Sequence, residues 1–263
     1  GLDLLKDYTV VMTGSHPEYH TREMLDALEA YRDSGGRLMY LGGNGFYWKI
    51  ALDPERDGVV EIRRGEGGIR AWAAESGEYY NQFDGEYGGL WRRNGRPPQN
   101  LVGVGFSAQG NFVGSHYVVD AQARESRAAW ILAGLDGATL GGHGLSGHGA
   151  AGFELDRADK NLGTPPHAVI LATSEGHEPE APWVLVPEER LTHLTTIPGA
   201  RDEELIKSDI VFFETPGNGA VFSVGSITFC GSLLTNGGDN DIARLTKNVL
   251  DRFADPGATF EMP

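Results

Sequence analysis

The first segment able to do chemistry is Gly14-Ser15-His16-Pro17-Glu18-Tyr19-His20, which places His16, Glu18 and His20 at alternate positions. Imidazoles and a carboxylate are common metal ligands, and Glu18 could serve as a hard oxygen ligand or as a base. A solvated loop explains the same pattern, because one carboxylate cannot hold a catalytic metal without further ligands. The pattern alone therefore leaves both interpretations open.

The second segment is Gly42-Gly43-Asn44-Gly45-Phe46-Tyr47-Trp48, which follows an apolar run. A strand followed by a glycine-rich turn resembles a nucleophile elbow, the tight turn at which class I glutamine amidotransferases carry a cysteine. Here Asn44 occupies that place, and an amide can form hydrogen bonds but cannot attack a carbonyl. Since Cys230 lies in a different run, cysteine-based glutaminase chemistry is excluded. An ordinary turn with Asn44 in a left-handed conformation is the alternative.

The third segment runs from Gly141 to Asp156 and is rich in glycine and alanine before it reaches Glu154. Such a segment lets backbone approach a site closely and could bring Glu154 into a dry pocket, where its pKa would rise and it could act as a general base. In the alternative interpretation the segment is a surface loop and Glu154 pairs with Arg157. His143 and His148 have no third ligand nearby, so we discount a zinc pair.

The first two segments follow elements typical of a βαβ unit. Residues 8–13 and 37–41 are apolar, β-branched runs that predict strands, and residues 21–34 predict a helix with Thr21 as its N-cap and Gly35-Gly36 as its stop. The crossover should be right-handed. In open parallel sheets, ligands bind beyond the carboxyl ends of the strands, which is where both segments lie.

The remaining pattern predicts one α/β domain over residues 1–263, with an open, mostly parallel sheet flanked by helices and an irregular or β-rich insertion at about residues 55–122. Inside the insertion we expect strand-like pieces at residues 59–62 and 69–72 and packing around Trp72, Tyr79, Tyr80 and Trp91. Further strands are predicted at residues 167–172 and 208–213 and as a pair within 220–230, and helices at about 124–135 and at 241–253, the last capped by Asn240 or Asp239.

Composition restricts the class of protein. The net charge of −15 argues against a nucleic-acid partner, because phosphate binding requires a basic face. No apolar run approaches the ~20 residues that a membrane-spanning helix needs, so we expect no membrane association. The single cysteine, Cys230, excludes an internal disulfide framework and a CxxC metal site, and we expect it to be a buried small residue. A cytoplasmic location is the default.

Several blocks, spread in order along the chain, resemble the large (β) subunit of N,N-dimethylformamidase, namely its C-terminal domain, which has a glutamine-amidotransferase-like and flavodoxin-like fold. The blocks are Thr13–Tyr19 (TGSHPEY), Arg37–Trp48 (RLMYLGGNGFYW), Arg127–Ile131 (RAAWI), Gly152–Arg157 (GFELDR), Gly225–Ile227 (GSI) and Leu245–Asp251 (LTKNVLD). The resemblance covers about residues 8 to 255.

This resemblance implies a metal-dependent amide hydrolase that converts dimethylformamide and water to formate and dimethylamine. The family uses one ferric iron, Fe³⁺, held by two tyrosinates and one glutamate. The resemblance makes Glu18 the carboxylate ligand, places His16 and Asn44 in the same pocket, and makes Glu154 the candidate general base. Hard oxygen donors suit Fe³⁺, which acts as a Lewis acid.

The family pattern does not make Tyr19, Tyr40 or Tyr47 iron ligands, because its two tyrosines lie upstream of this domain. We therefore expect the chain to be a C-terminal fragment of a longer subunit that is inactive and binds iron weakly by itself. The resemblance also implies a small subunit as partner and a hetero-oligomer. Two alternatives remain open: a non-catalytic scaffold or carbohydrate-binding domain related to trehalose-utilisation proteins, and a hydrolase of the same mechanism acting on another small amide.

Overall fold

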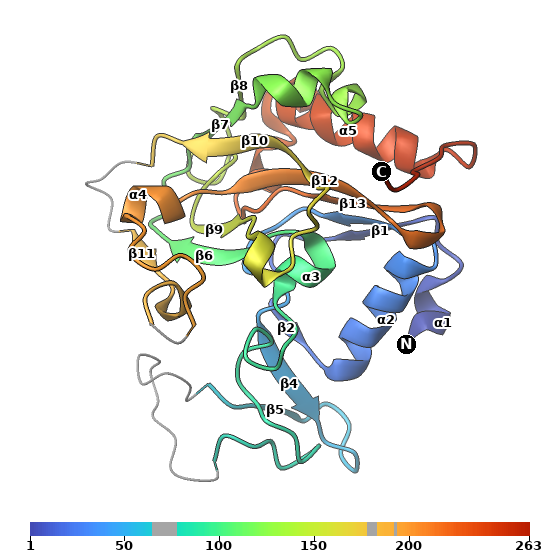
Figure 1. Cartoon of the computed structure of the whole chain (residues 1–263), viewed down its shortest axis with the longest axis vertical. Helices are drawn as coiled ribbons and strands as arrows, with labels where there is room; N and C mark the ends of the chain where they lie inside the picture. Colours follow the sequence, from blue (N-terminus) through green and yellow to red (C-terminus); the bar gives the residue numbers. More distant parts are fainter. Residues whose placement is uncertain (65–77, 178–182, 192–193) are drawn as a thin grey trace.

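The computed structural model describes residues 1–64, 78–177, 183–191 and 194–263, and its strands form one seven-stranded sheet and two three-stranded sheets (Figure 1). The strands are β1 (Val10–Thr13), β2 (Tyr19–His20), β3 (Arg37–Tyr40), β4 (Trp48–Leu52), β5 (Val60–Ile62), β6 (Gly105–Gln109), β7 (His116–Val119), β8 (Thr139–Leu140), β9 (Glu154–Arg157), β10 (Val169–Glu175), β11 (Val184–Leu185), β12 (Asp209–Thr215) and β13 (Gly219–Ser223). The α-helices are α1 (Leu2–Leu5), α2 (Arg22–Asp33), α3 (Pro98–Val102), α4 (Asp202–Leu205) and α5 (Asp241–Ala254).

The predicted βαβ unit at the start of the chain is confirmed. Strands β1 and β3 are parallel, with Val10 opposite Arg37 and Thr13 opposite Tyr40, and α2 connects them. Thr21 caps α2, because its side-chain oxygen accepts a hydrogen bond from the backbone N–H of Met24 at 3.2 Å. The unit therefore brings the ends of β1 and β3, and the segments that follow them, to one edge of the sheet.

The seven-stranded sheet has the order β1-β3-β13-β12-β10-β7-β8 and is mixed, so the prediction of a mostly parallel sheet is wrong. Only the pairs β1–β3 and β3–β13 of this sheet are parallel; the other four are antiparallel. The reason is visible at β12 and β13, which are joined only by residues 216–218. A parallel connection needs a crossover of a dozen or more residues, and this short one permits only a hairpin. A flavodoxin-like topology is therefore not confirmed.

Two other predicted elements are wrong in detail. Residues 124–135 do not form one α-helix but contain the end of the 3-10 helix η2 (Ala121–Glu125) and the whole of the 3-10 helix η3 (Ala129–Leu132). The Ser126 hydroxyl bonds locally to Ala123 O and Ala128 N, which competes with helical hydrogen bonding between them. The run 220–230 forms one strand only, because Gly225 takes a φ of +66° and the chain then enters the 3-10 helix η7 (Phe229–Ser232).

The remaining predicted strands and the last helix are confirmed in part. The pieces at residues 59–62, 208–213 and 241–253 are confirmed as β5, β12 and α5, while the strand predicted at 167–172 begins later, as β10. Asn240 caps α5 by accepting a hydrogen bond from Ala243 N at 2.8 Å. The predicted strand at 69–72, with Trp72, lies outside the described residues. That residues 1–263 form one domain with an insertion stays a prediction.

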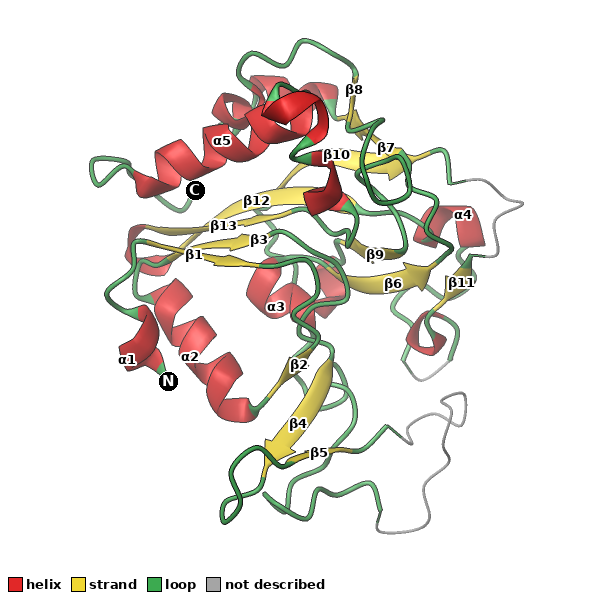
Figure 2. Ribbon diagram, turned by 180° about the vertical axis from the view of Figure 1, so that it is seen from behind, coloured by secondary structure: helices red, strands yellow, loops and turns green. Residues whose placement is uncertain are grey.

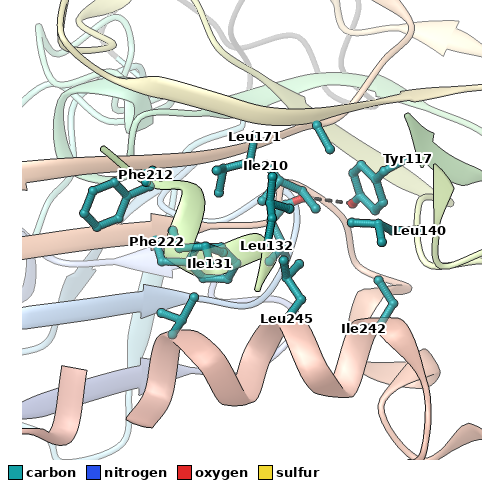
Figure 3. Packing of buried hydrophobic residues seen from close by; sticks show 14 of the residues in the cluster. Tyr117, Ile131, Leu132, Leu140, Leu171, Ile210, Phe212, Phe222, Ile242 and Leu245 are labelled. Carbon is teal, nitrogen blue, oxygen red and sulfur yellow. Dashed lines mark hydrogen bonds between the residues drawn. The ribbon is translucent and has the colours of Figure 1, made fainter. Parts of the chain in front are cut away.

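The large sheet buries both faces. Helix α5 covers one face and α2 lies against the other in both views (Figures 1 and 2). Alternate strand residues accordingly enter two cores, so that Met39 and Phe212 pack on the α5 side while Leu38 and Phe213 pack on the α2 side. Figure 3 shows the larger core, where Ile242 and Leu245 of α5 meet residues of the sheet and of η3.

Within the described ranges, we find no helix with the length and apolar character required to cross a lipid bilayer.

Helix α5 gives a direct test of the larger core. Leu245 is fully buried, whereas Leu250 on the same helix is 37% exposed. We expect Leu245→Ala to lower the free energy of unfolding by about 2–5 kcal/mol, because it removes buried methyl groups and leaves a cavity. The matched substitution Leu250→Ala should cost less than about 1 kcal/mol. Urea unfolding measures both changes, and equal losses would contradict this packing.

Candidate functional site

The segments after β1 and β3 lie side by side and are joined by backbone hydrogen bonds. Gly43 N donates to Ser15 O at 3.1 Å, Phe46 N to Pro17 O at 2.8 Å and Tyr47 N to Glu18 O at 3.0 Å. The sequence predicted this proximity from the parallel arrangement of β1 and β3. The hydrogen bonds fix the loop that carries His16 and Glu18 against the turn that carries Asn44.

Strand β9, which carries Glu154, packs against the turn that carries Asn44. A Cβ atom on Gly43 would lie 2.7 Å from Glu154 O, and one on Gly42 would lie 2.3 Å from Ser15 O. Both distances are shorter than real carbon contacts, so these two positions accept only glycine without a shift of backbone. The glycines of the turn thus allow three pieces of backbone to meet, which places Glu154 beside Asn44.

Four predicted site residues come together around one nitrogen atom. His16 Nε2 lies 3.2 Å from Glu154 Oε2, 3.3 Å from Glu18 Oε2 and 3.2 Å from Asn44 Nδ2. The His16 side chain is 38% exposed, while those of Glu18 and Glu154 are only 11% and 8% exposed. Solvent therefore reaches the cluster through the imidazole side. We call His16, Glu18, Asn44 and Glu154 the carboxylate–imidazole cluster.

His20 does not belong to this cluster, although its spacing matched that of His16 and Glu18. Its ring packs against Phe46 with centroids 4.7 Å apart, and burial lowers its pKa to about 4. In strand β2 the side chain of Tyr19 is exposed and that of His20 is buried. Of the three residues at alternate positions, only His16 and Glu18 join the cluster.

Burial of the Glu154 carboxyl dominates the electrostatics of the cluster. It raises the pKa of Glu154 to about 7, and the neighbouring carboxylates of Glu18 and Asp156 act in the same direction, whereas contact with the Asn44 amide opposes them. Arg157 does not neutralise Glu154, since its guanidinium pairs with Glu189 at 2.6 Å and Asp159 at 3.0 Å. The alternative pairing of Glu154 with Arg157 is therefore wrong.

Asn44 of the cluster and two residues next to cluster members in sequence or in the turn adopt backbone conformations that residues other than glycine rarely take. Asn44, Phe46 and Phe153 have φ values of 50°, 58° and 63°. Such conformations cost about 1–3 kcal/mol each and concentrate at functional sites. The left-handed conformation of Asn44, which belonged to the ordinary-turn alternative, is present, and it occurs together with the contact to His16. The turn is thus both an Asn-Gly turn and part of the cluster.

Two buried residues that the sequence did not single out support the turn. Asp156 Oδ1 accepts a hydrogen bond from Asn44 N at 2.7 Å, and Asp156 Oδ2 accepts one from the Tyr40 hydroxyl at 2.8 Å. One signal was available for Asp156, because residues two apart on a strand face the same side and Glu154 had already been selected. No signal pointed to Tyr40 as its partner.

The other candidates lie apart from the cluster. His143 Nε2 contacts Asp241 Oδ1 at 2.8 Å, and the half-buried Cys230 lies against Leu41 O. The Tyr47 hydroxyl donates to Glu188 at 2.8 Å. A cavity of about 300 Å³ beside the start of α5 is lined by none of the four cluster residues. Among the residues that the structure describes, no three or more His, Cys, Asp or Glu side chains form a group able to hold a metal ion.

Comparisons with known proteins cover almost the whole chain. Residues 1–241 match the family described as "N,N-dimethylformamidase beta subunit-like, C-terminal". The chain belongs to this family. It is 41% identical over 254 residues to the N,N-dimethylformamidase beta subunit of Paracoccus aminophilus and 40% identical over 254 residues to that of an Alcaligenes species.

Each comparison covers 96% of this chain but 33% of the relative, so the chain spans about a third of the length of the curated relatives it matches. The resemblance stated from the sequence blocks is confirmed at the level of the dimethylformamidase β-subunit family. The name "beta subunit" implies that these relatives belong to a multi-subunit complex.

The raised pKa of Glu154 predicts how stability depends on pH. The carboxyl keeps its proton up to about pH 7 in the folded chain but releases it near the ordinary value of 4.5 after unfolding. Between these values the folded state binds more protons, so the carboxyl's contribution to the free energy of unfolding falls as pH rises. Relative to Glu154→Gln, the unmodified chain should lose stability from pH 4.5 to 7 and no further above it. Urea unfolding at several pH values measures this difference, and a constant difference would contradict it.

Proposed function

We propose that this chain is the C-terminal part of a dimethylformamidase-like β subunit and that its carboxylate–imidazole cluster contributes to hydrolysis of a small amide, N,N-dimethylformamide. The convergence of Glu18, Asn44 and Glu154 around His16 Nε2 carries the proposal. Family membership and about 40% identity over nearly the whole chain support it.

The donor atoms of the cluster fit the proposed ferric iron in kind. Glu18 and Glu154 supply carboxylate oxygens, and Asn44 Oδ1 is a buried oxygen without a hydrogen-bond partner among the described residues. Unpaired buried oxygens are costly, and hard oxygen ligands are those that Fe³⁺ prefers. Glu18 would hold the metal, together with ligands from outside this chain. When bound, the iron would supply Lewis-acid polarisation of the amide carbonyl.

Glu154, Asn44 and His16 would each have a role in the hydrolysis that follows from its position. Glu154, with a pKa of about 7, would be partly ionised at neutral pH and would accept the proton of the water that attacks the amide carbon. As the C–N bond breaks, the same carboxyl would return that proton to the departing amine nitrogen. Asn44 and His16 would orient the water and stabilise the developing negative charge on the carbonyl oxygen by hydrogen bonds.

The proposal also includes the setting of the reaction. The complete protein would be a cytoplasmic hetero-oligomer in which an upstream domain of the same subunit supplies two tyrosine ligands and a small subunit is the partner. The chain by itself would be inactive, because it would lack the tyrosine ligands. A screen of formamides and acetamides with the complete protein separates dimethylformamide from another small amide, and iron-free, inactive complete protein would favour a non-catalytic domain.

The metal role of Glu18 has a test that does not depend on activity. In the complete, assembled protein, Glu18→Gln should weaken iron binding at least about tenfold, because a neutral amide replaces a charged ligand. Glu23→Gln is the matched control, since the Glu23 side chain is 70% exposed at the start of α2. Iron per subunit, measured by elemental analysis after dialysis, gives the comparison. Equal iron content in the two variants would remove Glu18 from the metal site.

The base role of Glu154 is tested separately. Glu154→Gln keeps the shape of the side chain but cannot take a proton, so turnover should fall by about 10²–10⁴-fold while iron content stays unchanged. Steady-state kinetics on dimethylformamide, with iron measured on the same samples, separates the two effects. Full turnover in the iron-loaded variant would show that Glu154 is not the base.

A further inference from the structure

The turn that presents Asn44 is held by a fully buried carboxyl group. Both oxygens of Asp156 have a partner in the region of the turn, namely the Asn44 backbone N–H at 2.7 Å and the Tyr40 hydroxyl at 2.8 Å. Asp156 is 0% exposed. Burying a carboxyl group is costly unless its oxygens are hydrogen-bonded, so these two contacts fix where the carboxyl group can lie.

The Tyr40 hydroxyl also holds the next residue of the turn. It donates to Asp156 and accepts a hydrogen bond from the Gly45 backbone N–H at 2.7 Å. A Cβ atom on Gly45 would lie 2.7 Å from the Tyr40 ring, so the phenol fits against a glycine and against no larger residue. The carboxyl group and the phenol therefore hold two consecutive amides of the turn.

These hydrogen bonds hold the turn at Asn44, where the backbone conformation is strained. Asn44 has a φ of 50°, and a left-handed residue persists only when its surroundings over-determine its conformation. The Asn44 side chain lies 3.2 Å from His16, so its direction depends on that backbone conformation. Burial, with the adjacent Asp156, also raises the pKa of Tyr40 well above its ordinary value, which keeps the phenol a hydrogen-bond donor.

We propose that Asp156 and Tyr40 form a positioning pair, which orients the Asn44 side chain for the reaction by holding the backbone amides of Asn44 and Gly45. Neither residue touches the substrate in this scheme, and both act through Asn44. The inference rests on the proposed function, because it assigns the pair to the same site.

Two conservative variants of the complete protein test the pair. Tyr40→Phe removes one hydroxyl, and Asp156→Asn keeps the size and one acceptor oxygen. Each has a matched control. Tyr117 is a fully buried tyrosine whose hydroxyl bonds to Val224 O at 2.8 Å, and Asp209 is a buried carboxylate that accepts from Ala158 N at 2.8 Å and Thr173 Oγ1 at 2.7 Å. Tyr117→Phe and Asp209→Asn therefore remove equivalent buried groups away from the turn.

We expect Tyr40→Phe to lower kcat on dimethylformamide by about 10²-fold with little change in KM, because misdirected groups cost turnover more than binding. Asp156→Asn should also lower kcat, but by a smaller factor than Tyr40→Phe. The two controls should keep kcat within about threefold of the unmodified protein. A kcat for Tyr40→Phe equal to that of Tyr117→Phe, or a change confined to KM, would overturn the proposal.

Hydrogen exchange separates this inference from the proposed function. In the unmodified chain the amides of Asn44 and Gly45 should be protected, and in Tyr40→Phe the Gly45 amide should exchange at least about tenfold faster than its neighbours in β3. This readout needs no substrate. Unprotected amides in the unmodified chain would overturn the positioning pair even if a variant failed to fold. Protected amides in a protein without amidase activity would leave the pair in place and reject the hydrolase proposal.

Discussion

Close contact between the turn at residues 42–46 and strand β9 is the constraint on which the site depends. The glycines at 42 and 43 let the backbone of the turn approach Ser15 and Glu154, and no larger residue fits there. This approach buries the Glu154 carboxyl and raises its pKa to about 7. The Asn44 Oδ1 oxygen is buried beside it without a hydrogen-bond partner among the described residues, which costs about 1–3 kcal/mol.

The parts of the fold that could be predicted from sequence are those set by local pattern. The helix capped by Thr21 and the strands on either side of it were found because apolar spacing, a capping side chain and a glycine stop agreed. The direction of the later strands could not be found in this way. An apolar run such as residues 208–213 reads the same in a parallel or an antiparallel pair, and its direction follows from the three-residue connection to β13.

The residues of the site also differ in whether a local pattern could reveal them. Alternate spacing selected His16, Glu18 and His20 together, but only the structure separates His20, which packs on Phe46, from the other two. Asp156 and the turn are 112 positions apart at their point of contact, so no local pattern could reveal that it holds the amide of Asn44. The resemblance supplied Glu18 and Glu154 by matching blocks, and it was silent on the residues that support them.

We propose that three segments distant in the sequence build one metal-dependent site around His16. X-ray anomalous scattering at the iron edge, recorded from crystals of the complete assembled protein, tests it most directly. We expect one iron peak within bonding distance of a Glu18 carboxylate oxygen, with the Asn44 and Glu154 side chains facing it. An iron peak elsewhere in the protein, with Glu18 directed away from it, would contradict a metal site at this cluster.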